Sequence, residues 1–590
     1  MNTVDERDAL VHPVSLFEYA ARLHDACPDA RLPRGGSPYP DDGSQPGCSR
    51  DRVPAKERAA ALLSVLEAYF ADPSAPAQIL HDELSRLDAP VWTVDSALSG
   101  LAMTEAGRTR ETGAWLVRHG SDRRPVLVGL GLLAVAGRPD DVPLIKTIGL
   151  LDCFGPAAVR ALAAVSSATH DLIWLAERSE RWARVKAIEA LSQRGGSDAV
   201  AWLLRHAVDS EGMSASDALQ VAEAVSLADA LEDANVEDQV LDQAGRLLLA
   251  MATPNDYRVQ LSSYSDACRA YLALARHAST MPASMDRLGI LVSLTEELIT
   301  GYAACLDWSP GQRDKVLAEL HATVRRAEWQ EVLGQALRSP DPLTRRRAEW
   351  ARTAIAAARN SAPDPRGIQI QVVATDPHRR SDVETRVLID GRPVIAAAFD
   401  KGAPNPPEAL LTRGRLHAND EAHEVKLSEA YCSEGCCGAL YVTVVRDGNT
   451  VVWRDWRGHT SEEAPPEVRF DAARYDAALA KAEADHSWEW PARTLARLLR
   501  DQLTAHPDLL ARWQCHLEWI MARSHEPGQA RLSFSYPERP TYTDKEPRLQ
   551  FELVIQLDQT STADQAAYII EQLETVDPKT LTAVVGGNRD

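Results

Sequence analysis

Three cysteines crowd one short segment of this 590-residue chain, and thiols at such close spacing are suited to binding a metal ion. The segment 431–438 reads Tyr-Cys-Ser-Glu-Gly-Cys-Cys-Gly, and its thiols belong to Cys432, Cys436 and Cys437. Zinc binds thiolate and imidazole groups in tetrahedral sets. We therefore predict a zinc site formed by these cysteines with a histidine, and the candidates for that ligand are His459, His417 and His423.

Two other interpretations of the segment stay open. Gly435 and Gly438 permit positive φ, which favours a tight turn with small, partly buried thiols. Alternatively, one thiol is a redox group or a nucleophile, which requires a neighbouring base or positive charge. Adjacent Cys436 and Cys437 argue against a shared metal ion, because neighbouring side chains of an extended chain point to opposite sides.

A second set of residues is of the types that anchor protein interfaces, namely Trp and Arg. We predict partner contacts from Arg345, Arg346, Trp453 and Trp456. On a regular strand, Trp453 and Trp456 point to opposite faces. The alternative is that the tryptophans pack in the core, with one partner for each N–H, and that the arginines begin a solvated helix.

Motifs of common enzyme classes are missing from the sequence. It contains no G-x-x-x-x-G-K-[ST] phosphate loop, no H-E-x-x-H motif and no G-x-S-x-G nucleophile elbow. Gly129-Leu130-Gly131 lacks the third glycine and the preceding strand of a dinucleotide fingerprint. We therefore assign no catalytic residue and no cofactor besides zinc, and expect a protein that is not an enzyme.

The elements that carry these residues are of two kinds. From about 54 to 360, apolar residues recur at i, i+3, i+4 and i+7, which predicts helices separated by short Gly, Pro, Ser or Asp breaks. The stretch 133–137 aligns with 191–195 at an offset of 58 residues, and Leu162 begins a similar helix about halfway between. This predicts a unit of about 29 residues with two helices, the arrangement of a solenoid.

A recurring pattern within this range carries a family resemblance. A leucine-ended helix, an Asp-Pro turn and an Arg-x-x-Ala helix start follow one another over 337–348, and Arg184-Val-Lys-Ala187 copies that start. The pattern resembles HEAT-type repeats of the short, bilin-lyase-like variety, over roughly residues 54–360. The resemblance implies an α-solenoid whose concave side binds another macromolecule.

The helical periodicity ends at 360–367, Asn-Ser-Ala-Pro-Asp-Pro-Arg-Gly, and we place a domain boundary there. Alternating apolar residues then predict strands over 367–374, 383–389, 392–396, 424–429, 439–445, 450–453, 513–521, 530–536 and 549–557. Helices are predicted over 472–484, 491–505 and 562–573, and 584–587 is predicted to be a frayed end. Residues 367–590 are thus expected to form an α+β domain with a mostly antiparallel sheet. Before the repeats, residues 1–53 are predicted to contain one helix, over 13–26, and a flexible linker that includes residues 32–44.

Composition limits the compartment and the partners. The chain has 64 basic and 85 acidic residues and a net charge of −21, which disfavours nucleic acid and anionic membranes as partners. It shows no secretory signal and no membrane-spanning apolar run. Its nine scattered cysteines fit reduced thiols, and its 55 Arg against nine Lys indicate a GC-rich, bacterial genome. We expect a cytoplasmic location.

These observations favour a non-catalytic scaffold that binds a protein partner along the helical repeat surface. The alternative is a metal-dependent or thiol-dependent enzyme or sensor centred on the Cys432–Cys437 loop. A third hypothesis is that the acidic solenoid sequesters a basic partner.

Overall fold

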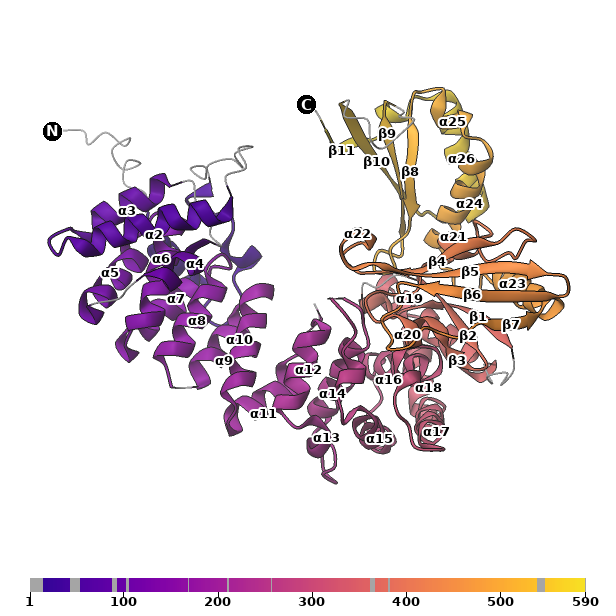
Figure 1. Cartoon of the computed structure of the whole chain (residues 1–590), viewed down its shortest axis with the longest axis horizontal. Coiled ribbons are helices and arrows are strands. Elements are labelled where there is room, and N and C mark those ends of the chain that lie inside the picture. Colours follow the sequence, from indigo (N-terminus) through magenta and orange to yellow (C-terminus); the bar gives the residue numbers. More distant parts are fainter. Residues whose placement is uncertain are drawn as a thin grey trace. The chain divides into compact units, whose positions relative to one another are not determined.

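The structure is a computed structural model of the chain. It describes residues 14–42, 54–87, 93–101, 105–167, 169–209, 212–255, 257–360, 367–379, 383–537 and 547–588. The chain forms two compact units, the first of Met1–Asp209 with Gln220–Leu227 and the second of Ser210–Leu219 with Ala228–Asp590. The division falls at helix α12, Ala215–Ala224, within the predicted helical range (Figure 1).

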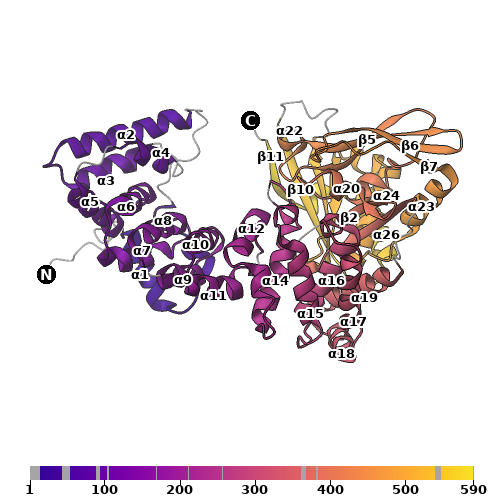
Figure 2. The same cartoon turned by 60° about the horizontal axis from the view of Figure 1, so that its bottom comes forward.

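The described part of the first unit is helical, as the apolar periodicity predicts (Figures 1 and 2). Its α-helices are α1 Leu16–Ala26, α2 Ala55–Ala71, α3 Ala77–Arg86, α4 Val94–Gly100, α5 Ala106–His119, α6 Arg123–Ala136, α7 Val142–Gly149, α8 Gly155–Val165, α9 Thr169–Arg178, α10 Arg181–Arg194 and α11 Ser197–His206. Each buries an apolar stripe; in α6, for example, Val126, Leu130 and Leu133 are fully buried.

Helices α5 to α11 pack on near neighbours in the sequence. Each contacts the following helix or the helix two places along, as α6 contacts α8, α8 contacts α10, and α9 contacts α11. The starts of α6 and α10, Arg123 and Arg181, lie 58 residues apart, which equals the offset of the sequence repeat. Helices α5 and α6 approach each other closely, because a Cβ added to Gly129 would lie 2.8 Å from the Gly113 carbonyl oxygen. Close packing therefore explains Gly129.

The Gly- and Pro-rich segment 32–42 packs onto these helices, although its composition predicts a flexible linker. Gly35 has a left-handed φ of +59°, and a Cβ there would lie 2.6 Å from the Cβ of Asp152. Only glycine fits this approach without strain. Residues 1–13 and 43–53 of the predicted N-terminal region lie outside the described residues.

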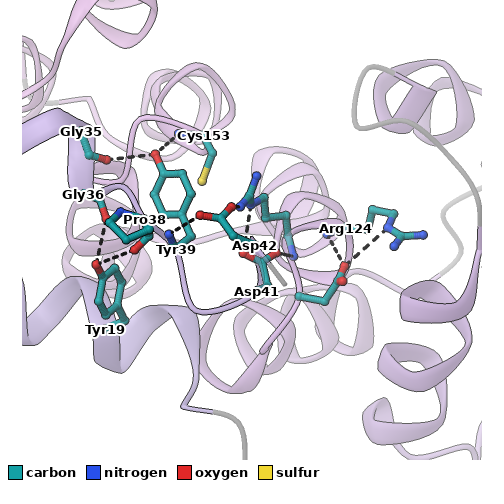
Figure 3. Close-up of polar contacts among 11 residues, drawn as sticks. Tyr19, Gly35, Gly36, Pro38, Tyr39, Asp41, Asp42, Arg124 and Cys153 are labelled. Atoms are coloured by element: carbon teal, nitrogen blue, oxygen red, sulfur yellow. Dashed lines mark hydrogen bonds and ion pairs between the residues drawn. The ribbon is translucent and has the colours of Figure 1, made fainter. Parts of the chain in front are cut away.

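Tyr39 is the centre of this contact (Figure 3). Its hydroxyl donates to the Gly35 carbonyl (3.0 Å) and accepts from the Cys153 N–H (3.4 Å). The Arg123 guanidinium lies over the Tyr39 ring, 4.6 Å from its centroid, and its Nε is 3.0 Å from Oδ1 of the buried Asp41. The polar groups of Tyr39 and Asp41 are thus paired within the unit, which stabilises the docked conformation of the segment.

In the second unit, a group of helices precedes the strands in the sequence. These helices are α14 Asp238–Met251, α15 Ala267–Ala278, α16 Met285–Thr300, α17 Gln312–Val324, α18 Ala327–Leu337 and α19 Pro342–Asn360. Helix α19 packs on α16 and α18.

Three antiparallel sheets follow, where the sequence predicts one mostly antiparallel sheet. Their orders are β1–β2–β3, β4–β5–β6–β7 and β11–β10–β9–β8. The strands are β1 Ile368–Ala374, β2 Val383–Ile389, β3 Arg392–Pro393, β4 His423–Glu429, β5 Ala439–Asp447, β6 Thr450–Arg457, β7 Val468–Asp471, β8 His516–Met521, β9 Gln529–Tyr536, β10 Arg548–Gln556 and β11 Ala583–Asn588. The helices among them are α20 Val394–Ala398, α21 Pro407–Leu410, α22 Glu434–Cys437, α23 Ala472–Ala484, α24 Pro491–Ala505, α25 Asp508–Ala511 and α26 Thr562–Thr575.

Sheet β4–β7 and helix α23 share an apolar core with aromatic side chains at its centre. Trp453 and Tyr475 are fully buried, and the Trp453 ring packs edge-on against Phe470 at a centroid distance of 6.0 Å. The Trp453 Nε1–H donates to the Tyr475 hydroxyl (3.3 Å), which in turn donates to the Leu416 carbonyl (2.6 Å). Every polar group of this cluster therefore has a partner in the core.

Buried ion pairs join the helices to the first sheet. Arg347 of α19 binds Asp376, which follows β1, through Nη2–Oδ2 (2.8 Å) and Nε–Oδ1 (2.9 Å). Arg386 of β2 binds Glu297 of α16 through Nη2–Oε1 (2.7 Å). These four side chains are buried, so the residues on both sides of 361–366 belong to one packed unit.

Two short elements differ from the sequence expectation. The strand predicted over 392–396 ends at Pro393 and turns into α20, because proline offers no N–H to continue a ladder. The end predicted to fray is strand β11, which pairs with β10, with Val584 opposite Phe551.

Candidate metal centre

The three predicted thiol ligands lie on a short connection between β4 and β5. These strands pair antiparallel up to Glu429 and Ala439, and the Ala430 N–H donates to the Gly438 carbonyl (3.0 Å). Gly438 has a φ of +95°, which a glycine adopts without strain. Between these residues the chain forms α22, a single helical turn.

The structure brings the three thiols together. The sulfurs of Cys432, Cys436 and Cys437 lie within 4.8 Å of one another, and those of Cys436 and Cys437 are 3.7 Å apart. Two thiolates bound to one tetrahedral zinc at about 2.3 Å lie about 3.8 Å apart. The spacing of this pair therefore fits a shared metal ion.

The local backbone removes the objection that adjacent cysteines diverge. Cys436 and Cys437 lie in a helical turn rather than an extended chain, and both of their N–H groups donate to the Ser433 carbonyl (3.2 and 3.1 Å). A single turn is too short to show a helical period in the sequence. The condition for opposite directions, an extended chain, is therefore not met.

The Cys432 and Cys437 thiols shift each other's pKa in opposite directions. The neighbouring Cys437 side chain favours the Cys432 thiolate, which lowers the pKa of Cys432. The same contact retains the proton on Cys437 and raises its pKa to about 11. Cys432 and Cys436 are exposed and Cys437 is half-buried, so solvent reaches the cluster.

Among the described residues, no imidazole is part of this cluster. The His459 imidazole contacts its own loop instead, where its Nδ1 is 3.1 Å from the Ser461 carbonyl oxygen. The alternative ligands are paired elsewhere, His417 with Glu483 and His423 with the Arg415 carbonyl. The described site is a set of three sulfurs.

A charged network fixes the loop to the strands that flank it. Lys426 and Tyr441 are directly opposite each other on β4 and β5. The Tyr441 hydroxyl donates to Glu434 of α22, and Lys426 Nζ lies 3.3 Å from the same carboxylate and 2.5 Å from Glu429. The Glu434 N–H donates to Glu429 Oε1 (3.0 Å).

The pKa shifts within this network have local causes. The Tyr441 hydrogen bond lowers the pKa of Glu434, and the bond from Lys426 lowers the pKa of Glu429. The Glu429 carboxylate raises the pKa of Lys426. The sequence analysis assigned no role to these residues, although Lys426 and Glu429 belong to a predicted strand next to the thiols.

The two tryptophans predicted to contact a partner are core residues. Trp453 is fully buried and Trp456 is 9% exposed, with ring centroids 5.9 Å apart. They share a face because β6 has one extra residue opposite β5, and Asp455 within it has a φ of +52°. This β-bulge cancels the strict alternation that sets them on opposite faces.

The predicted arginine contacts are also largely turned inward. Arg346 is 5% exposed, and its guanidinium stacks on the Trp490 ring at 4.6 Å. Burial lowers the pKa of Arg346 to about 10. Arg345 is half-buried and donates to the Ser339 carbonyl (2.8 Å). The start of α19 is therefore a packed helix end rather than a solvated one.

A half-buried carboxyl group lies in a separate pocket of α16, α17 and α19. Burial raises the pKa of Glu296 to about 8, and His321 and Arg325 also line this pocket. Its cavity of about 10 Å³ has room for about one water molecule. The pocket is too small for a substrate, so the thiol cluster is the stronger candidate.

Fold and site together define a chain of helices followed by antiparallel sheets, with an exposed three-thiol cluster on the second sheet. No protein family, no curated protein and no solved structure matches it. In the part of the chain that the structure describes, no helix is long and apolar enough to cross a membrane.

Proposed function

We propose that the loop of Cys432, Cys436 and Cys437 binds a thiophilic metal ion, with zinc as the first candidate, and makes the chain a metal-responsive protein. The observation that carries this proposal is the approach of all three sulfurs to within 4.8 Å of one another. Soft thiolate ligands favour zinc and monovalent copper over hard cations.

The surroundings suit an exchangeable ion better than a closed structural one. Structural zinc sites have four protein ligands, whereas this cluster offers three in the described residues and faces solvent. The fourth position is left to water or to a ligand from outside. A bound ion would act there as a Lewis acid, while the chain's own residues orient the thiols: Lys426, Tyr441 and Glu429 hold Glu434 and with it the turn.

The test is a zinc titration of the reduced, metal-free full-length chain against a chromophoric competitor. We expect one zinc per chain. Cys436→Ser should lose more affinity than the roughly 10–100-fold typical of an outer-shell partner. Cys27→Ser, which removes a half-buried thiol of the first unit, is the matched control and should leave the affinity unchanged.

A histidine variant tests the composition of the site. His459→Ala should bind zinc as the unsubstituted chain does, because its imidazole is not part of the cluster. A zinc affinity that falls with His459→Ala but not with Cys436→Ser would contradict the proposed ligand set.

We also propose, as a second function, that the helices of residues 54–360 form a HEAT-like solenoid that binds a protein partner. The near-neighbour packing of α5 to α11 supports this reading, because solenoid repeats contact mainly their neighbours. The net charge of −21 makes a protein a better partner than nucleic acid. Free thiols fit the reducing cytoplasm of a bacterium.

An exposed tryptophan offers a test of the scaffold. Trp182 of α10 is 63% exposed, and tryptophan is among the commonest interface anchors. Crosslinking of the full-length chain in cells should give a specific protein partner that is lost with Trp182→Ala. It should be retained with Tyr257→Ala, a similarly exposed aromatic of the second unit. Equal loss of the crosslinked partner in both variants, or the absence of a specific partner for the unsubstituted chain, would count against the scaffold.

A further inference from the structure

The contact among the three thiols has a second chemical consequence, independent of any metal ion. All three are free, two are exposed, and their sulfurs lie within 4.8 Å of one another. A disulfide requires an S–S distance of about 2.05 Å, so the sulfurs need to approach by less than about 3 Å. We infer that this cluster is a site of reversible oxidation, at which a peroxide joins Cys432 and Cys437 in a disulfide.

The placement of the cysteines around α22 favours this pair. Cys432 precedes the turn and Cys437 ends it, and their sulfurs lie within 4.8 Å of each other. Adjacent Cys436 and Cys437 share a helical turn, which a disulfide between them would distort. A Cβ built at Gly435 meets no atom within 4 Å, so the turn has open space in which to adjust.

Three other described cysteines lack these conditions. Cys153, Cys268 and Cys305 are partly or largely shielded, and burial raises the pKa of Cys153 to about 12 and those of Cys268 and Cys305 to about 11. A shielded, protonated thiol reacts slowly with peroxide. Oxidation is therefore expected at the cluster before it reaches these three thiols.

The reaction balances with hydrogen peroxide as the oxidant. One deprotonated sulfur attacks a peroxide oxygen, the O–O bond breaks, and the departing oxygen takes up a proton and leaves as water. The second sulfur then attacks the resulting sulfenic acid, the S–O bond breaks, and a second water leaves as the S–S bond forms. Two thiols lose two electrons and two protons, and one peroxide becomes two waters.

Oxidation and metal binding compete for the same sulfurs. A disulfide between Cys432 and Cys437 removes two of the three thiolates, so a bound ion should leave. Only this step rests on the proposed function, because the disulfide itself needs no metal. The cluster then reports the presence of peroxide by releasing its ion.

The experiment treats the full-length reduced chain, with and without prior zinc loading, with equimolar hydrogen peroxide. We expect a mass loss of two hydrogens in the peptide that contains Cys432 and Cys437, reversal by a dithiol, and release of the loaded zinc to an indicator dye. Cys436→Ser should still form the disulfide, and Cys432→Ser should not. Backbone circular dichroism of both variants checks that they fold.

The outcomes separate the two claims. A disulfide without zinc binding would refute the proposed metal site and support the inference. Zinc binding with thiols that stay reduced, or that proceed only to sulfinic acid, would overturn the inference and leave the metal site standing. Oxidation of Cys153 or Cys268 before the cluster would also overturn it.

Discussion

Adjacent arginines at the start of α19 should differ strongly in their response to the same substitution. Arg347→Met removes the partner of the buried Asp376 carboxylate, which is 3% exposed. Breaking a buried ion pair by removing one partner costs about 3–5 kcal/mol, because the remaining charge stays buried. At about 1.4 kcal/mol per tenfold, local opening of α19 and β1 should become about two to three and a half orders of magnitude more frequent.

Arg346→Met is the matched control one residue away. In the described residues, Nε and Nη2 of Arg346 are buried without a hydrogen-bond partner, and its guanidinium stacks on the Trp490 ring. Loss of the cation–π contact costs about 0.5–2 kcal/mol, and removal of unsatisfied buried donors returns about 1–3 kcal/mol. We expect a net change near zero or a gain in stability.

Hydrogen–deuterium exchange of the full-length chain measures both variants. Peptides that cover 342–358 and 368–374 should lose protection strongly in Arg347→Met and little in Arg346→Met. Exchange resolves this region without the assumption that two compact units unfold together. Equal loss of protection in both variants would refute the account that the buried ion pair joins α19 to the first sheet.

Three further predictions concern the second sheet. Zinc binding should release about three protons per ion near neutral pH, and the affinity for zinc should fall as the pH is lowered. The reason is that the thiols must lose their protons to bind the ion, and the pKa of Cys437 is raised to about 11. Calorimetry in buffers of different ionisation enthalpy counts the released protons, and the absence of proton release would contradict thiolate ligation. Glu434→Gln should weaken zinc binding about 10–100-fold by loosening the turn. Glu424→Gln, which breaks the exposed ion pair with Arg457, should leave the affinity for zinc unchanged. Equal zinc affinities of the two variants in competitor titrations would contradict a role for Glu434 at the site. Trp456→Ala should cost about 3–5 kcal/mol, as loss of a buried tryptophan does, seen as a lower unfolding midpoint; a variant with unchanged stability would contradict its place in the core.

Long, periodic elements could be predicted from the sequence to the residue. The helices at 472–484 and 491–505 and the strand at 383–389 have the predicted bounds, because each carries a clear period and ends at a Gly, Pro or Asp signal. The approach of Cys432 to Cys436 and Cys437 was also implied by their short separation. These features depend on local sequence alone.

The parts that sequence reasoning missed depend on single backbone angles or distant partners. The left-handed backbone conformation of Asp455 reverses the direction of the Trp456 side chain, and an aspartate in the sequence does not by itself predict a bulge. Arg346 and Arg347 resemble a solvated helix start until Trp490 and Asp376 are placed against them. The segment around Tyr39 has the composition of a linker, but its contacts with residues distant in the sequence, such as Arg123 and Cys153, hold it in place.

The most direct test of the metal-binding account is X-ray absorption at the metal edge of the reduced full-length chain, purified without chelator and loaded with one equivalent of zinc. The account predicts one zinc per chain with three sulfur neighbours at about 2.3 Å and one lighter neighbour. It also predicts loss of one sulfur in Cys437→Ser. No bound zinc, or a shell of mainly nitrogen and oxygen, would contradict a three-thiolate centre at Cys432, Cys436 and Cys437.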